Sequence, residues 1–515
     1  MRPSINAIIA IFGLLLASGQ AYAQPQEATS VDDPAAASVA AEPSADTSRY
    51  RAKLDAAQAL ASAADHLGAS RALSSVIGDD RFGDLPAEDR RITLSMAAWA
   101  AIQLRQLPRA RDFYLQATNA DPRDPDDWYR LSMVEASLDN HDASARALQE
   151  MVEVWPELLD NLDDGFVFQL IYAMEPHSDA RLSLLQALFD ANWTNNHISP
   201  SSAWYELALM RIMRNQPEAA RAAISRIESP EALIKIRSDR RFDSLINSAS
   251  RAFDVEDAAR RRVEDLRQHA SVQPTRLELR TQLSYALLTA GLNDAVLALA
   301  DEVEVLIEGS DEAPFTDMDE RLWVANNRAI ALRRLGRTDD ALAALHRASH
   351  LDEAAADNVS QALNLGHFYT SLVRPDDAIA AVALKGDMSG YGRMVQATVR
   401  HRAALQKDDR GGAAKQLRYL GGHRKDAELI WVEALLDASR VDEAASVVIE
   451  LLASPADRPD VLNWAQTYRV ADPLPGDVQL RAGRAALLAR TDVLDAVAKV
   501  GRIQRYDIYG DNGTE

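Results

Sequence analysis

Two histidines and three aspartates have the spacing that comes closest to a metal site. His346 and His350 are four residues apart, and on one helix face that spacing allows two imidazoles to share an ion. No third ligand lies within sequence reach, so a solvated surface pair is the better interpretation. Asp160, Asp163 and Asp164 suggest a calcium loop, but the spacing differs and the required Glu twelve positions on is missing. These residues predict an acidic turn, and neither a metal nor any other cofactor is expected.

Catalytic motifs are missing from the sequence. It contains no H-E-x-x-H, no G-x-x-x-x-G-K-[ST] and no G-x-S-x-G, the patterns of zinc proteases, phosphate loops and serine hydrolases. Glycines concentrate between residues 386 and 422, but a phosphate loop needs a buried strand before it, and no segment reads as a strand. We therefore predict loops there.

Two polar sets have a functional and a structural interpretation. Tyr205, His197 and Arg211 are close enough in sequence to suggest the cleft of a helical-repeat enzyme acting on polysaccharide. Their spacing is not distinctive, and we predict that the protein is not an enzyme. The basic run at residues 260–262 is interleaved with acids, so salt bridges along a helix explain it without an anionic ligand.

The composition favours helices and argues against nucleic acid. The 515 residues are 47% apolar and 26% charged, with a formal charge of −21 and no Cys. An acidic chain is repelled on average by nucleic acid and by anionic membranes. The absence of Cys excludes thiolate metal sites, disulfides and a lipid attached to cysteine. Ala, Leu and Arg are in surplus, as in helical proteins.

Residues 90–156 contain two copies of one pattern, offset by 34 residues from Pro122 to Pro156. The first copy consists of Leu94, Ala97, Ala98, Ala110, Tyr114, Ala117 and Pro122, and the second of Trp128, Leu131, Ser132, Ser144, Leu148, Met151 and Pro156. These occupy the slots of W-x2-L-G-x2-Y…A-x3-F…A…P, so the region resembles the tetratricopeptide repeat (TPR). Small residues let two antiparallel helices approach closely, and Pro starts the turn to the next unit.

Five further units fit the same template. They are centred on Trp204 to Ile224, Leu283 to Ala295, Ala329 to Asp352, Leu365 to Val382 and Trp431 to Leu451. Seven units in one chain predict an all-α fold, a right-handed α-solenoid of antiparallel helix pairs. Residues 158–192 and 393–420 read as helical but match the template poorly.

A second internal similarity has a longer range. Leu73, Asp79, Arg81, Phe82 and Leu85 recur in identical spacing as Leu233, Asp239, Arg241, Phe242 and Leu245. We interpret both stretches as caps or junctions, with an Arg-bearing docking element as the alternative. The second copy places a boundary between an N-terminal solenoid (49–250) and a C-terminal solenoid (251–506).

The two ends are expected to lie outside the solenoid. Arg2, the apolar run from Ile5 to Ala17 and the small residues before Gln24 read as a signal peptide (1–23) cleaved near Ala23-Gln24. The run is too short to span a membrane. Residues 24–48 hold Ala, Pro, Ser and acids without a base, which predicts a disordered linker. Residues 507–515 are predicted to be a frayed tail.

The resemblance also implies a concave groove lined by template positions 2, 5, 9, 12 and 13 of each first helix. Transferred slot by slot, these positions are Trp99, Gln103, Tyr129, Met133, Tyr205, Met213, Asn326, Arg333 and His367, with Ile92, Ile102, Leu209, Ile212, Trp323, Ile330, Arg334 and Thr370 beside them. The N-terminal part of this strip is apolar and aromatic, suited to a helix or an extended peptide. The alternative for each residue is packing against neighbouring repeats. The family's carboxylate clamp, a set of Lys, Asn and Arg at fixed slots, is not present in these units.

The sequence therefore favours an exported, non-catalytic scaffold in the periplasm or cell envelope. Its expected partners are other envelope or periplasmic proteins, including a membrane-bound one, while the chain itself does not span the membrane. Two alternatives remain at this stage: the periplasmic part of an exopolysaccharide export or secretion system, and a helical-repeat enzyme acting on polysaccharide.

Overall fold

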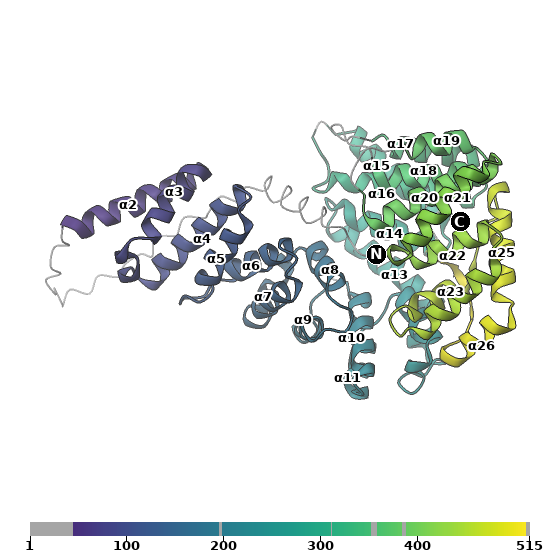
Figure 1. Ribbon diagram of the computed structural model, residues 1–515, viewed down its shortest axis with the longest axis horizontal. Coiled ribbons are helices and arrows are strands. Elements are labelled where there is room, and N and C mark those ends of the chain that lie inside the picture. The colour runs from purple at the N-terminus through teal and green to yellow at the C-terminus, as the bar shows by residue number, and fades with distance from the viewer. Residues whose placement is uncertain (1–44, 195–197, 311, 352–357, 384–387, 511–515) are drawn as a thin grey trace. The chain divides into compact units, whose positions relative to one another are not determined.

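The computed structural model describes residues 45–510 except 195–197, 311, 352–357 and 384–387 (Figure 1). The predicted signal peptide and most of the predicted linker lie outside the described residues. The chain divides into two compact units after Trp193. The boundary predicted at residue 250 instead falls inside the second unit, because residues 230–250 pack against the C-terminal end of the chain, as described below.

The N-terminal unit (described residues 45–193) consists of helices joined by short turns. Its helices are α2 (Ala45–Ser62), α3 (His66–Ile77), α4 (Ala87–Gln103), α5 (Leu107–Ala117), α6 (Pro125–Ser137), α7 (His141–Val154), α8 (Asp164–Ala173) and α9 (Asp179–Asp190). The first six form three pairs, and α8 and α9 both pack on α7. The short 3-10 helices η1 (Asp80–Asp84) and η2 (Pro156–Asn161) lie between pairs.

The C-terminal unit (described residues 194–510) continues the same arrangement. Its helices are α10 (Ser201–Met213), α11 (Pro217–Ile224), α12 (Pro230–Ser238), α13 (Val255–Val272), α14 (Leu277–Thr289), α15 (Asn293–Glu308), α16 (Arg321–Arg334), α17 (Thr338–Ala348), α18 (Val359–Ser371), α19 (Pro375–Ala381), α20 (Gly390–Gln406), α21 (Arg410–Gly422), α22 (Glu428–Asp437), α23 (Val441–Ala453), α24 (Arg458–Trp464), α25 (Val478–Leu488) and α26 (Thr491–Val500). Short 3-10 helices separate some of them: η3 (Arg240–Phe242), η4 (Arg251–Phe253), η5 (Met318–Glu320), η6 (Arg424–Asp426) and η7 (Pro475–Asp477).

The residues that define the repeat are the ones that bring the helices of a pair together. Ala110, Tyr114 and Ala117 on α5 have no exposed surface, and Ala208 and Ala220 pack in the same way between α10 and α11. An Ala at the crossing point allows two helix backbones to approach, and the larger side chain one turn on fills the remaining space. The predicted α-solenoid of helix pairs is therefore confirmed.

One backbone cap recurs at the end of the helices. Ten described residues have φ between +54° and +75°: Ala64, Arg105, Asp139, Asn192, Asn215, Gly291, Gly336, Val373, Asp408 and Ser439. In every case the next residue donates its N–H to the carbonyl oxygen five positions back, over 2.8–3.0 Å. This is the hydrogen bond of the Schellman motif, which ends a helix and redirects the chain. The poorly matching stretches 158–192 and 393–420 carry the cap too, at Asn192 and Asp408.

The described part of the glycine-rich stretch, residues 388–422, consists mainly of helices and their ends rather than the predicted loops, and Gly386 lies outside the described residues. Ser389 caps α20 by accepting the N–H of Gly392 over 3.0 Å, and Asp409 caps α21 by accepting the N–H of Gly412 over 2.9 Å. Gly421 belongs to the last turn of α21. Side-chain caps of this kind satisfy the free N–H groups of the first helical turn.

The repeated Asp–Arg stretches have the same local structure. Asp79 and Asp239 each cap a 3-10 helix by accepting the N–H of the Arg two residues on, and each pairs with that Arg side chain. The second copy also contacts the end of the chain, since Arg241 donates to the carbonyl oxygen of Pro455 over 3.1 Å. The first copy binds the carbonyl oxygen of Asp46 at the start of α2. Both copies act as junctions.

The end of the C-terminal unit packs on its beginning. Helix α24 lies against α12, where Lys235 and Asp460 form an ion pair of 2.8 Å. Asp239 and Gly501 form an isolated β-bridge. Two short strands, β1 (Thr467–Arg469) and β2 (Arg505–Tyr509), pair in parallel. The sequence suggested no strand. Residues 507–509 belong to β2, and Ile508 is buried, so this part of the predicted frayed tail is ordered. Residues 511–515 lie outside the described residues.

No helix in the described part of the chain has both the length and the apolar character that crossing a membrane requires.

Substituting Val373 by Gly should stabilise the protein. Val373 has φ +57° and is 45% exposed, so a β-branched side chain occupies a left-handed backbone without contributing much buried surface. Left-handed backbone costs an L-residue about 1–2 kcal/mol, part of which the greater freedom of Gly in the unfolded chain offsets. We expect Val373→Gly to raise the free energy of unfolding by about 0.5–1 kcal/mol in chemical denaturation.

The reciprocal control is Gly336→Val at the equivalent turn. Gly336 has φ +75°, and a Cβ added there would meet no atom within 4 Å, so we expect the loss of stability to come mainly from the backbone. Equal stability of both variants and the parent chain would contradict this account of the turns.

Candidate functional site

Of the groove residues predicted in the C-terminal unit, Arg333 and Arg334 on α16 contact the chain's own C-terminal segment. The guanidinium of Arg333, buried on α16, donates to the carbonyl oxygen of Asp472. Arg334, one residue on, stacks at 3.8 Å on the ring of Tyr509. Asn326 is 3% exposed and accepts a hydrogen bond of 2.9 Å from Asn364 on the next pair. These side chains are therefore occupied inside the protein.

Segment 472–477, which we call the C-terminal strap, fits too closely against α18 to leave a groove there. A Cβ at Gly476 would lie 2.2 Å from the carbonyl oxygen of Thr370, so only Gly fits at this position. Gln406 on α20 donates to the same Thr370 oxygen over 2.6 Å. Thr370, another predicted groove position, has no exposed surface.

A buried charged network holds the C-terminal strap in place. Arg402 on α20 is 3% exposed and donates to Asp477 over 2.8 Å and to the carbonyl oxygen of Gly476 over 2.7 Å. Ser371 donates to the same Asp477 oxygen over 2.8 Å. His367, a predicted groove residue, lies 3.2 Å from Arg402 through its Nε2 atom. The imidazole must be neutral and accept at this nitrogen, because Arg can only donate.

The surroundings shift the pKa values within this network. Burial and the neighbouring Arg402 lower the pKa of His367 from 6.5 to about 4. Burial alone would raise the pKa of Asp477, but Arg402, His367 and Ser371 outweigh burial and lower it. At neutral pH the network therefore contains a charged Arg–Asp pair and a neutral His.

The predicted groove residues of the N-terminal unit are only partly covered. Trp99 on α4 is half-buried, and the guanidinium of Arg130 on α6 lies 4.8 Å above its ring. Gln103, one turn further along α4, is also half-buried, whereas Met133 on α6 is 5% exposed and packs inside. Two predicted positions, Trp99 and Gln103, together with Arg130, which was not predicted, form what we call the N-terminal groove surface.

Tyr129 has a structural role. Its hydroxyl accepts the N–H of Asp163 over 3.1 Å, and its ring meets Phe166 edge-on at 5.8 Å. Burial raises its pKa to about 12. Asp163 in turn caps α8 by accepting the N–H of Phe166 over 2.7 Å, so the acidic turn predicted at 160–165 contains a helix cap.

The remaining predicted residues do not assemble a site. Tyr205 is 2% exposed and stacks on Phe242 at 5.7 Å, and burial raises its pKa well above the ordinary value. Met213 is 43% exposed at the end of α10. Of the alternative catalytic set, Arg211 contacts Gln216 over 2.6 Å, and His197 lies outside the described residues. A buried, protonated Tyr cannot meet a substrate.

No described group of three His, Asp or Glu side chains is placed to hold a metal ion. His346 and His350 stack with ring centroids 4.5 Å apart, and Nδ1 of His350 lies 2.8 Å from the carbonyl oxygen of His346. The pair therefore makes local contacts on α17 and its end.

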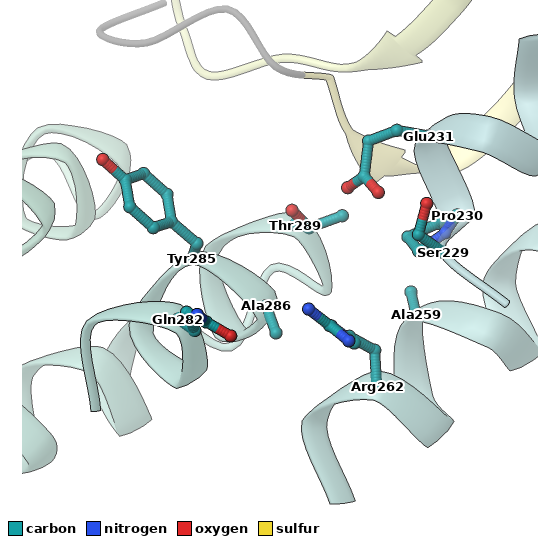
Figure 2. Close-up of a pocket in the computed structure, with 9 residues that line it drawn as sticks. All are labelled: Ser229, Pro230, Glu231, Ala259, Arg262, Gln282, Tyr285, Ala286 and Thr289. Atoms are coloured by element: carbon teal, nitrogen blue, oxygen red, sulfur yellow. The ribbon is translucent and has the colours of Figure 1, made fainter. Parts of the chain in front are cut away.

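A cavity of 170 Å³ lies between α12, α13 and α14 (Figure 2). Arg262 on α13 and Glu231 on α12 face it, and Gln282 and Thr289 on α14 complete its polar lining. The interleaved acids predict salt bridges as the explanation of the basic run at 260–262. That explanation holds for Arg260 and Arg261, both paired with Asp257, but not for Arg262. Sequence spacing alone does not distinguish the third Arg, because its surroundings come from two other helices.

Comparisons with known proteins add little. No family model and no curated protein matches the sequence. Among solved structures the chain is similar to the APC/C hetero-tetramer Cut9–Hcn1 (12% identity, TM-score 0.34, 87% of this chain and 80% of that one). It is also similar to Naa15/Naa10 bound to HypK-THB (13%, 0.26, 87% and 80%) and to the P58(IPK) TPR domain (12%, 0.20, 78% and 99%). The fold assignment rests on the helix contacts above and not on these scores.

Replacing His367 by Gln should make the protein less sensitive to acid. The folded-state pKa of His367 lies below the unfolded value, so unfolded chains take up the proton first and stability falls as the pH drops from about 6.5 towards 4. This shift corresponds to a loss of at most about 3 kcal/mol. Gln keeps an acceptor for Arg402 but does not titrate. We expect the parent chain to lose more unfolding free energy than His367→Gln between about pH 7 and about pH 4.5, measured by urea denaturation.

His423→Gln is the matched control, since His423 is exposed and stacks only on Tyr419 of its own helix. A parallel pH dependence in all three proteins would show that His367 is not the group responsible.

Proposed function

We propose that this TPR-like solenoid is a non-catalytic scaffold of the cell envelope that holds a helix or an extended segment of a partner protein on its N-terminal groove surface. The main observation behind this proposal is that Arg130 stacks on the half-buried Trp99. The two residues lie on α6 and α4, which are the first helices of two successive helix pairs. Trp, Tyr and Arg are the residues that most often dominate binding energy at protein interfaces. A guanidinium over an indole offers a flat surface that is apolar in its centre and polar at its edge.

The C-terminal unit supports this choice by contrast. Its corresponding positions, Arg333, Arg334, His367 and Thr370, are occupied by residues 472–509 of the same chain. A partner segment would have to displace the C-terminal strap and break the buried 2.8 Å pair of Arg402 with Asp477, which leaves the guanidinium only the longer 3.7 Å pair with Asp437. Gln103 and Trp99 carry no such internal segment among the described residues.

Two further observations support a binding role without catalysis. The Tyr of the only catalytic set suggested by the sequence is buried in the core. Two buried carboxylates of the N-terminal unit have structural partners, in the 2.9 Å pair of Arg91 with Asp127 and the 2.8 Å pair of Arg111 with Glu135. Carboxylates held in this way stabilise the packing of neighbouring helices.

A photo-crosslinking residue at Gln103 should capture a specific envelope protein. The matched position is Gln116, an exposed Gln on the second helix of the same pair. We expect one dominant crosslinked partner from Gln103 and none from Gln116, detected by mass spectrometry after expression in an exporting bacterial host. Trp99→Ala should reduce the Gln103 product by about tenfold or more, as expected for an anchor worth 1.4 kcal/mol.

Trp155→Ala is the control for loss of an aromatic ring. Trp155 also has an Arg over its ring, Arg123 at 5.4 Å, but follows α7, the second helix of its pair. Identical products at both Gln positions, or equal effects of the two Trp substitutions, would contradict binding at the N-terminal groove surface.

Export should leave a mature chain that begins at Gln24. Ala21 and Ala23 are the small residues that signal peptidase requires at the third and first positions before the cut. We expect N-terminal sequencing of the periplasmic protein to start at Gln24, and Ala23→Arg to leave the precursor uncleaved. Recovery of the uncleaved parent chain from the cytoplasm would refute the envelope assignment while leaving the groove proposal open.

A further inference from the structure

The cavity between α12, α13 and α14 contains two opposite charges that do not meet. Arg262 points into it from α13, and the carboxylate of Glu231 points towards the guanidinium from α12 (Figure 2). Within the described residues Arg262 forms neither a salt bridge nor a hydrogen bond, although Arg260 and Arg261 beside it both pair with Asp257. A half-buried guanidinium without a partner is unfavourable, because burial removes water that no other group replaces. Burial accordingly lowers the pKa of Arg262.

The charges around the cavity decide which ligand would suit it. Besides Glu231, the acids Glu228 and Asp265 act electrostatically on Arg262. A simple anion bound to Arg262 would be repelled by these three carboxylates, and a simple cation beside Glu231 would be repelled by Arg262. A molecule that carries one positive and one negative charge, a few ångströms apart, is attracted by Arg262 and by Glu231 at once.

The neutral lining provides hydrogen bonds for the same kind of molecule. Thr289 lines the space and forms no side-chain hydrogen bond within the described residues. Ser229 accepts the N–H of Ala232 as the cap of α12, so its hydroxyl proton is available. Gln282 donates to Glu278 over 3.0 Å, which leaves its side-chain oxygen as an acceptor.

The size and access of the cavity set a limit on the ligand. Its 170 Å³ is comparable to an engineered cavity of about 150 Å³ that holds benzene, a molecule of six heavy atoms. Tyr285 at its rim is 42% exposed, so the space can be reached from solvent. A ligand of amino-acid size fits, and a folded domain does not.

We propose that this cavity is a binding site for a small zwitterion of the α-amino acid type, with the carboxylate on Arg262 and the ammonium group on Glu231. The site lies outside the N-terminal groove surface, and binding there does not depend on the proposed scaffold role. It assigns to the third Arg of the basic run a role that its two neighbours do not share.

Isothermal titration of the full chain with the neutral L-amino acids tests the proposal. At least one of them is expected to bind, and acetate and methylammonium, each carrying only one of the two charges, should bind at least tenfold more weakly. Arg262→Met and Glu231→Gln should each weaken that amino acid by tenfold or more. Arg260→Met is the matched control, an Arg on the same helix that is 68% exposed and paired with Asp257, and it should leave the affinity unchanged.

Three results would overturn the inference. One is that none of the amino acids binds the parent chain, which would mean that water fills the cavity. Another is that acetate binds as tightly as the amino acid and Glu231→Gln has no effect, which would make this a simple anion site. The last is an equal loss in Arg260→Met and Arg262→Met. A melting curve of each variant verifies that it is folded, and if Arg262→Met is not, Arg262→Lys and Glu231→Gln decide.

Discussion

The whole architecture depends on a backbone turn that ends one helix and returns the chain antiparallel to it within three or four residues. Nine of the ten residues with positive φ make this turn with the same hydrogen bond each time, whereas the equivalent cap at Asn192 is followed by α10 only at Ser201. Because the bond closes between backbone atoms, the turn has one geometry whatever side chain is present. The helix that follows therefore meets its predecessor at a fixed place, and an Ala such as Ala110 or Ala341 at that place allows close contact. Regular stacking of pairs follows from this constraint.

In the C-terminal unit, stacking brings residues far apart in sequence into contact. Arg333 and Asp472 are separated by 139 residues, and Arg502 and Asp243 by 259. After α23, helix α24 packs on α12 and strand β2 contacts α13 and α14, near the start of the unit, whereas α25 and α26 pack on α22 and α23. The C-terminal strap contacts Arg333 and Thr370, so these predicted groove positions are occupied internally. Among the predicted groove positions, Trp99 and Gln103 in the N-terminal unit are half-buried, and Met213 on α10 is 43% exposed.

The sequence revealed the helix pairs but not the turn that makes them. The Gly of the repeat template directly follows its Leu inside the first helix, as Gly366 follows Leu365, and the template fixes no residue at the turn, where only Gly291 and Gly336 of the ten residues are Gly. The other eight positions use other residues. For some of them, such as Val373 or Arg105, the residue type does not indicate a left-handed backbone. For that reason the sequence predicts helices over residues 393–420 but not a repeat unit. The turn at Asp408, between α20 and α21, is nevertheless equivalent to the others. The strands were missed because three and five residues give too little periodicity.

The candidate sites were predicted less well than the fold, and for a definite reason. Slot positions identify the face of a helix but not what covers that face. The faces that carry Arg333 and His367 were therefore predicted correctly, but the C-terminal segment that covers them was not. Arg262 was likewise judged by its neighbours in sequence, whereas its environment is made by α12 and α14. The boundary at 250 failed in the same way, because the contacts of Asp239 with Gly501 cross 262 residues. Long-range contacts of this kind leave no periodic signal.

The choice of charged rather than apolar residues beneath the C-terminal strap has a physical consequence. Apolar side chains pack against a helix in several registers of similar energy, since dispersion contacts are not directional. Arg402, at 3% exposure, has one arrangement in which its guanidinium meets Asp477, the Gly476 carbonyl and a neutral His367 together. A slip of one residue would move Asp477 away from the buried guanidinium and leave it only the longer 3.7 Å pair with Asp437, which is more costly than a lost apolar contact. The network therefore fixes the register of the strap, and with it the position of every residue from 472 to 477 against α16, α18 and α20.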